Sequence, residues 1–139
     1  MSLLRNSSRA IPRVLKTLSP VQTIRKMATP AATTKFEWMV IIPDHGGMLD
    51  KRMAVRSKHF EGLTANRENG FWKMGGALLE DVPGEDGKLK IEGSAMVAYA
   101  ASMEEVLEQL KKDVYAESGV WDFSKVQIWP FKCAFREKQ

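Results

Sequence analysis

Three polar side chains, Arg52, Arg56 and His59, bring two guanidinium groups and an imidazole to one face of a predicted helix. The stretch from Met48 to Leu63 has the apolar periodicity of an amphipathic helix, and positions i, i+4 and i+7 place these groups within its apolar side. That side is predicted to consist of Met48, Leu49, Met53, Val55, Phe60 and Leu63. Desolvating an unpaired charge is costly, so the stripe needs an acidic partner, a polar cavity or an anionic ligand. A structural ion pair and a pocket wall both satisfy this requirement.

Asp113 follows the second predicted helix and supplies a carboxylate. Continuing the helical register places Asp113 beside Val106 and Leu110, on the flank of the buried side of that helix. The macrodipole disfavours a negative charge at a helix C-terminus. Asp113 is therefore expected to face an inward arginine or histidine.

Other residue types limit the chemistry further. Gly75 and Gly76 interrupt a predicted strand, which indicates a bulge or a close approach of another backbone or a ligand. His45 has no second His or Cys at metal-ligand spacing, and Cys133 is the single cysteine. No phosphate-binding GxxxxGK[ST] loop occurs. We predict no metal and no cofactor.

Charge is unevenly distributed along the chain. Residues 1 to 35 contain seven basic residues and no acid, whereas residues 36 to 139 contain 14 basic and 17 acidic residues, a net charge of −3. The second part lacks the basic footprint of a nucleic-acid-binding domain. No apolar run approaches the roughly eighteen residues that a membrane span requires. We predict neither nucleic acid nor membrane as a partner.

Residues 1 to 34 are predicted to be a mitochondrial transit peptide and linker, and residues 35 to 139 the folded domain. The first segment is rich in Arg and Ser, has no acid, and can form a basic amphipathic helix. A disordered basic tail has a similar composition. We expect import into the mitochondrial matrix, or a cytoplasmic product if translation starts at Met27.

The domain is predicted to have the order β-α-β-β-α-β, an α+β ferredoxin-like fold. The strands are expected at 36 to 43, 71 to 79, 89 to 99 and 126 to 131. Asp44 is a candidate cap for the first helix, Asn66 to Gly70 its end, and Ser102 with Glu105 a capping box for the second. Two helices cover one face of such a sheet, yet the first strand is apolar on both faces. The uncovered face predicts a homodimer.

Four segments resemble the YCII-related proteins: RMAVRSKHFEGL from Arg52, the pair Gly75 and Gly76, GSAMVAYAASMEEVLEQLKKDVY from Gly93, and VQIWPF from Val126. The resemblance implies a dimeric α/β barrel in which His59 and Asp113 line a pocket. This chain has Asp113-Val114-Tyr115 where the family commonly has Asp-Pro-Tyr. Relatives with an assigned reaction imply acid-base work on small ring compounds, such as dehydrochlorination or lactone isomerisation.

Two functions remain open. The first is a cofactor-independent lyase or isomerase in which Asp113 orients His59 as a general base. Its small anionic or cyclic substrate is predicted to contact Arg52, Arg56, Gly75, Gly76 and Tyr115, where the arginines stabilise negative charge. The second is a non-catalytic ligand-binding or stress-associated dimer in which Asp113 pairs with Arg52 or Arg56. The partner of Asp113 distinguishes them.

Overall fold

A computed structural model describes residues 33–137. Nearly all of the predicted transit peptide and linker lies outside these residues. The described part contains β1 (Phe36–Pro43), α1 (Leu49–Glu68), β2 (Trp72–Leu79), β3 (Ile91–Ala100), α2 (Met103–Lys111), α3 (Val114–Glu117), the 3-10 helix η1 (Phe123–Lys125) and β4 (Gln127–Phe131). No helix among these residues is long and apolar enough to cross a membrane.

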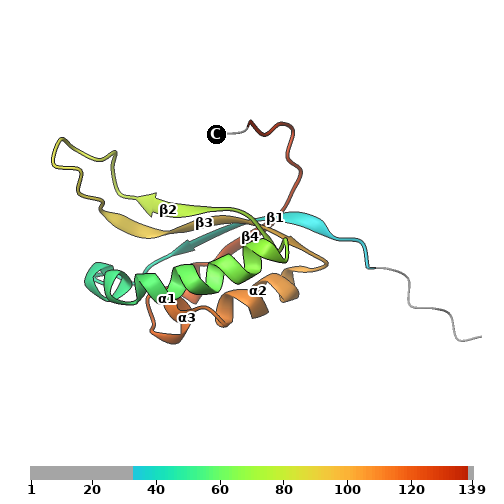
Figure 1. The fold of residues 1–139 in the computed structure, drawn as a ribbon, viewed down its shortest axis with the longest axis horizontal. Helices are drawn as coiled ribbons and strands as arrows, with labels where there is room; N and C mark the ends of the chain where they lie inside the picture. The colour runs from blue at the N-terminus through green and yellow to red at the C-terminus, as the bar shows by residue number, and fades with distance from the viewer. Residues whose placement is uncertain (1–32, 138–139) are drawn as a thin grey trace, which may run out of the picture. The chain divides into compact units, whose positions relative to one another are not determined.

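The strands form one antiparallel sheet in the order β2-β3-β1-β4, and α1, α2 and α3 lie on the same side of it (Figure 1). This confirms the predicted α+β ferredoxin-like fold. The short α3 and η1 are additions that the sequence pattern did not indicate. The first helix is longer than predicted and ends where Asn69 caps it and Gly70 takes a φ of 79°, a conformation that glycine adopts readily.

The core lies between the sheet and the helices. It is built from Val40 and Ile42 of β1, Met96 and Ala98 of β3, and Val106 and Leu110 of α2, with Tyr115, Val120 and Trp121 from the following segment. The predicted capping box is present, because the Glu105 backbone N–H donates to Ser102 Oγ over 3.2 Å. The Glu105 carboxylate in turn accepts from the Ala101 backbone N–H over 2.7 Å. These bonds fix where α2 begins.

The buried face of α1 differs from the prediction. Arg52 and His59 are its buried residues, whereas Met53 and Phe60 are 51% and 47% exposed. Neighbouring residues of a helix point about 100° apart, so a helix that turns Arg52 and His59 inward must turn Met53 and Phe60 outward. The two polar residues take the inner side because the domain supplies partners for them there.

Strand β2 contains a register shift that affects which side chains face the helices. Trp72 pairs with Ala98 and Met74 with Val97, so Lys73 is an extra residue between them. The bulge predicted at the glycines therefore occurs just before them. As a result, the strand register places Trp72, Gly75 and Ala77 on the helix side, level with Ala98, Met96 and Ser94.

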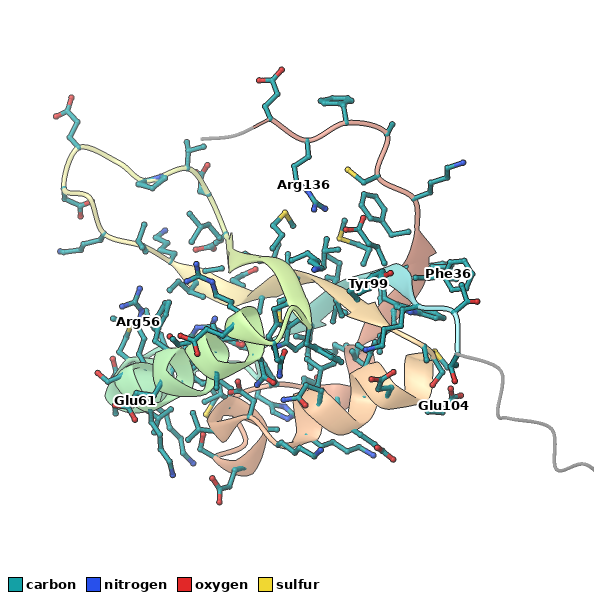
Figure 2. All side chains as sticks on the ribbon, turned by 45° about the vertical axis from the view of Figure 1, so that its right-hand side comes forward. Phe36, Arg56, Glu61, Tyr99, Glu104 and Arg136 are labelled. Atoms are coloured by element: carbon teal, nitrogen blue, oxygen red, sulfur yellow. The ribbon has the colours of Figure 1, made fainter. Side chains whose placement is uncertain are left out.

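The other face of the sheet has no helix on it (Figure 1). Strand alternation places Met39, Met74, Val97 and Trp129 on this face, and Trp129 is 60% exposed. The Arg136 guanidinium lies on this side in Figure 2 and reaches the Glu37 carboxylate over 3.0 Å. Apolar residues in the middle of an open sheet face favour a partner.

The homodimer stays a prediction, and Trp129 tests it. Trp129→Glu places a charge on the open face at the edge strand β4, where its desolvation opposes association through this face. We expect a chain lacking the first 33 residues to sediment as a dimer at micromolar concentration and its Trp129→Glu variant as a folded monomer. A parent protein that is already a stable monomer contradicts the dimer.

Candidate active site

His59 of α1 lies against the carboxylate of Asp113, which follows α2. The His59 Nδ1 atom is 2.8 Å from both Asp113 carboxylate oxygens. The two side chains are only 8% and 13% exposed. An ionised carboxylate can only accept, so the imidazole donates from Nδ1, and the neutral form of the ring has its free lone pair on Nε2.

The surroundings of Asp113 differ from the prediction. Helix α2 ends at Lys111, and Asp113 is the N-cap of α3, where its Oδ1 accepts from the Tyr115 backbone N–H over 2.8 Å. A carboxylate at a helix N-terminus is favoured, so the expected conflict with the α2 macrodipole does not arise. Val114 occupies the first position of α3, a position that proline tolerates well. The N-cap bond holds Asp113 without that proline.

Tyr115 links the histidine to Arg52. The Tyr115 and His59 rings stack with centroids 3.9 Å apart and planes at 22°. The Arg52 guanidinium carbon lies 4.4 Å from the centroid of the same tyrosine ring. Burial raises the pKa of the Tyr115 phenol, which the positive charges of Arg52 and Arg56 only partly oppose. The phenol is therefore neutral and forms a rigid wall beside the imidazole.

Arg52 is held by an acid that the sequence pattern assigned elsewhere. Its Nη1 donates to the two Asp44 oxygens over 2.7 and 2.9 Å, and its Nη2 donates to Ser94 Oγ over 2.8 Å. The prediction that Asp44 caps α1 is wrong, because Met48 is the N-cap and has no side-chain bond. Burial raises the pKa of Asp44, and the Arg52 charge opposes this effect.

A cavity of about 390 Å³ lies beside these groups. Six of the predicted site residues line it: Arg52, Arg56, His59, Gly75, Gly76 and Tyr115. Asp113 does not, so it supports the imidazole from behind and leaves the Nε2 edge as the part available to a ligand. The volume is within the usual range for small-molecule sites, about 300 to 1,000 Å³. Ser94, which no sequence motif indicated, also lines the cavity.

The cavity carries positive charge. Arg56, Arg67 and Lys73 line it as exposed side chains, and none of the described lining residues is Asp or Glu. The Arg56 guanidinium carbon lies 4.5 Å from the Phe60 ring centroid, and Figure 2 shows Arg56 projecting from α1. Positive groups around an apolar hollow attract anionic ligands and raise their association rate.

The remaining candidate ligands of a metal are dispersed. The His45 side chain is 50% exposed, with Nδ1 3.9 Å from the Asp122 carboxylate. Cys133 is a free thiol whose Sγ lies 3.0 Å from the Phe135 carbonyl oxygen. Residues 33–137 contain no group of three or more His, Cys, Asp or Glu side chains that could hold a metal ion.

Asp113→Asn tests whether the carboxylate fixes the tautomer of His59. The asparagine keeps the shape and can keep the Tyr115 cap, but its amide can also donate to Nδ1 and move the imidazole proton to Nε2. We expect nitrogen NMR to show Nδ1–H in the parent and a larger Nε2–H population in Asp113→Asn. An unchanged tautomer would show that Asp113 does not orient the ring.

Comparison with known proteins shows the family of the chain. The family model of the YCII-related domain matches residues 36–132. Fusaric acid biosynthesis protein 2 from Gibberella fujikuroi is 36% identical over 101 residues, which cover 73% of this chain and 97% of that protein. Aspartate kinase FUB3 from Fusarium oxysporum f. sp. lycopersici is 36% identical over 103 residues, or 74% of this chain, and the match spans only 19% of that longer protein.

A solved structure has the same fold. The 5-chloro-2-hydroxyhydroquinone dehydrochlorinase from Burkholderia phenoliruptrix AC1100, in complex with 2,5-dihydroxybenzoquinone, matches with a TM-score of 0.59 and 22% identity. The match covers 69% of this chain and 93% of that chain. The resemblance seen in the sequence is confirmed by the family match over residues 36–132. This chain belongs to the YCII-related domain family.

Proposed function

We propose that this protein is a cofactor-independent lyase or isomerase of small, anionic ring compounds, with His59 as its general base. The observation that carries the proposal is the contact of His59 Nδ1 with both Asp113 oxygens at the wall of a positively charged cavity. In the neutral imidazole this contact places the proton on Nδ1, so Nε2 is the nitrogen that can accept a substrate proton. The alternative of a non-catalytic dimer required Asp113 to pair with Arg52 or Arg56, but Arg52 pairs with Asp44.

The proposed step is proton abstraction. His59 Nε2 takes a proton from a C–H or O–H group of the bound ring, and the electron pair left behind forms a new double bond. In a lyase chloride leaves a tetrahedral ring carbon with the electron pair of the broken C–Cl bond, which for a chlorinated hydroxyhydroquinone requires the keto tautomer of the ring. In an isomerase an existing double bond shifts as the imidazolium returns the proton to another carbon. Asp113 stabilises the imidazolium, and the arginines stabilise negative charge on the substrate.

The comparisons support the substrate class. The solved relative is named for a dehydrochlorination and holds a hydroxylated quinone, and the Gibberella fujikuroi relative is named for fusaric acid biosynthesis. A hydroxylated or carboxylated ring fits the size of the cavity and its positive charge. We extend this class to the present chain as a proposal.

Turnover of chlorinated hydroxyhydroquinones and of unsaturated lactones tests the function. We expect chloride release from the first or a shifted double bond, seen by NMR, in the second, without any added metal or cofactor. Asp113→Asn should slow either reaction much more than it lowers the melting temperature. Binding of both compounds with no conversion and no exchange of substrate hydrogen for solvent deuterium would favour a binding protein.

We also propose import into mitochondria, on the basis of the acid-free, basic residues 1 to 35. The expected mature protein lacks roughly the first 26 to 33 residues and is recovered from the matrix. N-terminal sequencing of the endogenous protein from separated fractions measures this. An intact Met1 in the cytosolic fraction contradicts import, and a start at Met27 there indicates the shorter product.

A further inference from the structure

Ser94 of β3 has an unusual set of hydrogen-bond partners. Its Oγ accepts from Arg52 Nη2 over 2.8 Å and from Trp121 Nε1 over 3.1 Å, and the residue is only 3% exposed. A guanidinium and an indole are donors only, so both bonds use lone pairs of the serine oxygen. The hydroxyl proton of Ser94 is therefore left to donate to a third group.

Nothing in the described part of the protein accepts this proton. The side-chain hydrogen bonds of Ser94 there are the two in which it is the acceptor. A tetrahedral hydroxyl oxygen with two incoming bonds has one direction left for its own O–H. Ser94 lines the cavity between the sheet and α1. A ligand oxygen in this cavity would supply the acceptor that the Ser94 hydroxyl proton lacks in the described part of the protein, and would complete the three hydrogen bonds of the hydroxyl group.

We propose that the Ser94 hydroxyl donates a hydrogen bond to a phenolate or enolate oxygen of the ligand. The inference rests on the proposed function, because it concerns the same cavity, and it identifies the ligand by a single ring oxygen that carries negative charge. The Arg52 guanidinium donates to the same Ser94 oxygen, and its positive charge polarises the O–H bond and strengthens the donation to an anion. Asp44 acts as a positioning residue that fixes the Arg52 guanidinium.

Trp121 indicates how this donor relates to the proposed base. Its indole N–H bonds to Ser94, and its ring meets the His59 imidazole edge-on with centroids 5.9 Å apart. Trp121 therefore connects the donor to the base, and Ser94 and His59 both line the same cavity. Charge that develops on the ring oxygen as His59 removes a proton would then be stabilised by Ser94.

Two probes of nearly equal size separate an oxyanion contact from a packing role. One is 4-nitrophenolate, used at a pH where the phenol is ionised, and the other is its neutral methyl ether, 4-nitroanisole. We expect Ser94→Ala to weaken 4-nitrophenolate binding about tenfold to a hundredfold and 4-nitroanisole binding hardly at all. Ser94→Thr keeps a hydroxyl and should restore much of the phenolate affinity.

The absorbance of the bound phenolate gives a second measurement. Hydrogen bonding to the oxygen moves its band to shorter wavelength, so the band should lie at longer wavelength in Ser94→Ala than in the parent. Equal weakening of both probes assigns Ser94 to packing and overturns the inference. It is also overturned if the parent does not bind 4-nitrophenolate, or if Ser94→Ala binds it as tightly as the parent.

The outcome for catalysis is separate. His59→Ala should still bind 4-nitrophenolate through Ser94. A protein that binds the phenolate in this way but transfers no proton in the turnover assay contradicts the proposed reaction and leaves the Ser94 contact in place. If the parent turns over substrate but Ser94→Ala binds both probes as tightly as the parent, the proposed reaction stands and the Ser94 contact is wrong.

Discussion

His59→Ala is expected to lower turnover by about 10²-fold to 10⁴-fold, the range that a positioned general base contributes. The free energy of unfolding should fall by at most a few kcal/mol, through lost packing on Tyr115 and the lost bond to Asp113. The measurement is a comparison of turnover with chemical unfolding for the parent and the variant.

His45 provides the matched control. It is the other histidine of the chain and its side chain is half exposed in the loop after β1. His45→Ala should leave both turnover and stability close to the parent. A second variant, His59→Gln, keeps a donor toward Asp113 but has no basic nitrogen, so it should be folded and inactive. Full activity in either His59 variant would show that the histidine is a packing residue.

Asp44→Ala should have the largest effect on stability. It leaves the Arg52 guanidinium, 5% exposed, without its carboxylate, and breaking a buried pair in this way costs about 3 to 5 kcal/mol. Domains of this size are stabilised by only about 5 to 15 kcal/mol, so the melting temperature should fall strongly. Unfolding in urea, followed by tryptophan fluorescence, measures the loss.

Two further variants show whether the pair is the cause. Asp50→Ala removes an exposed acid from the first turn of α1 and should cost less than about 1 kcal/mol. The double variant Asp44→Leu with Arg52→Met removes both charges together and should recover much of the stability lost in Asp44→Ala. If Asp44→Ala behaves like Asp50→Ala, Arg52 does not depend on Asp44.

Sequence patterns predict some of these contacts and do not predict others, and the difference has physical reasons. The helix pattern predicted only that Asp113 would face an inward arginine or histidine, and the resemblance to the YCII-related proteins pointed to His59. The partner of Arg52 could not be derived, since Asp44 lies across a loop with Gly46 and Gly47 whose path no periodicity describes. The position of Asp113 relied on α2 continuing, whereas the chain turns after Lys111 and starts α3.

Ser94 could have been found from strand alternation. It shares the helix side of β3 with Met96, Ala98 and Ala100, so a polar residue on that side needs a buried partner. Buried polar partners also explain why Met53 and Phe60 are exposed. Apolar periodicity alone favours burial of the most apolar face of α1, but the paired side chains of Arg52 and His59 decide which face of the helix turns inward.

The extra residue Lys73 in β2 determines the floor of the cavity. If Lys73 were paired in the ladder instead of forming the bulge, side-chain alternation from Trp72 would put Met74 under α1 and turn Gly75 to the opposite face of the sheet. A thioether would then fill space that a hydrogen atom now leaves open. The room for a ligand therefore depends on the bulge as well as on residue type. A relative of the same length that pairs every residue of this strand would present the opposite set of side chains to its helices, whereas a relative one residue shorter before the glycine pair would keep the same faces without a bulge.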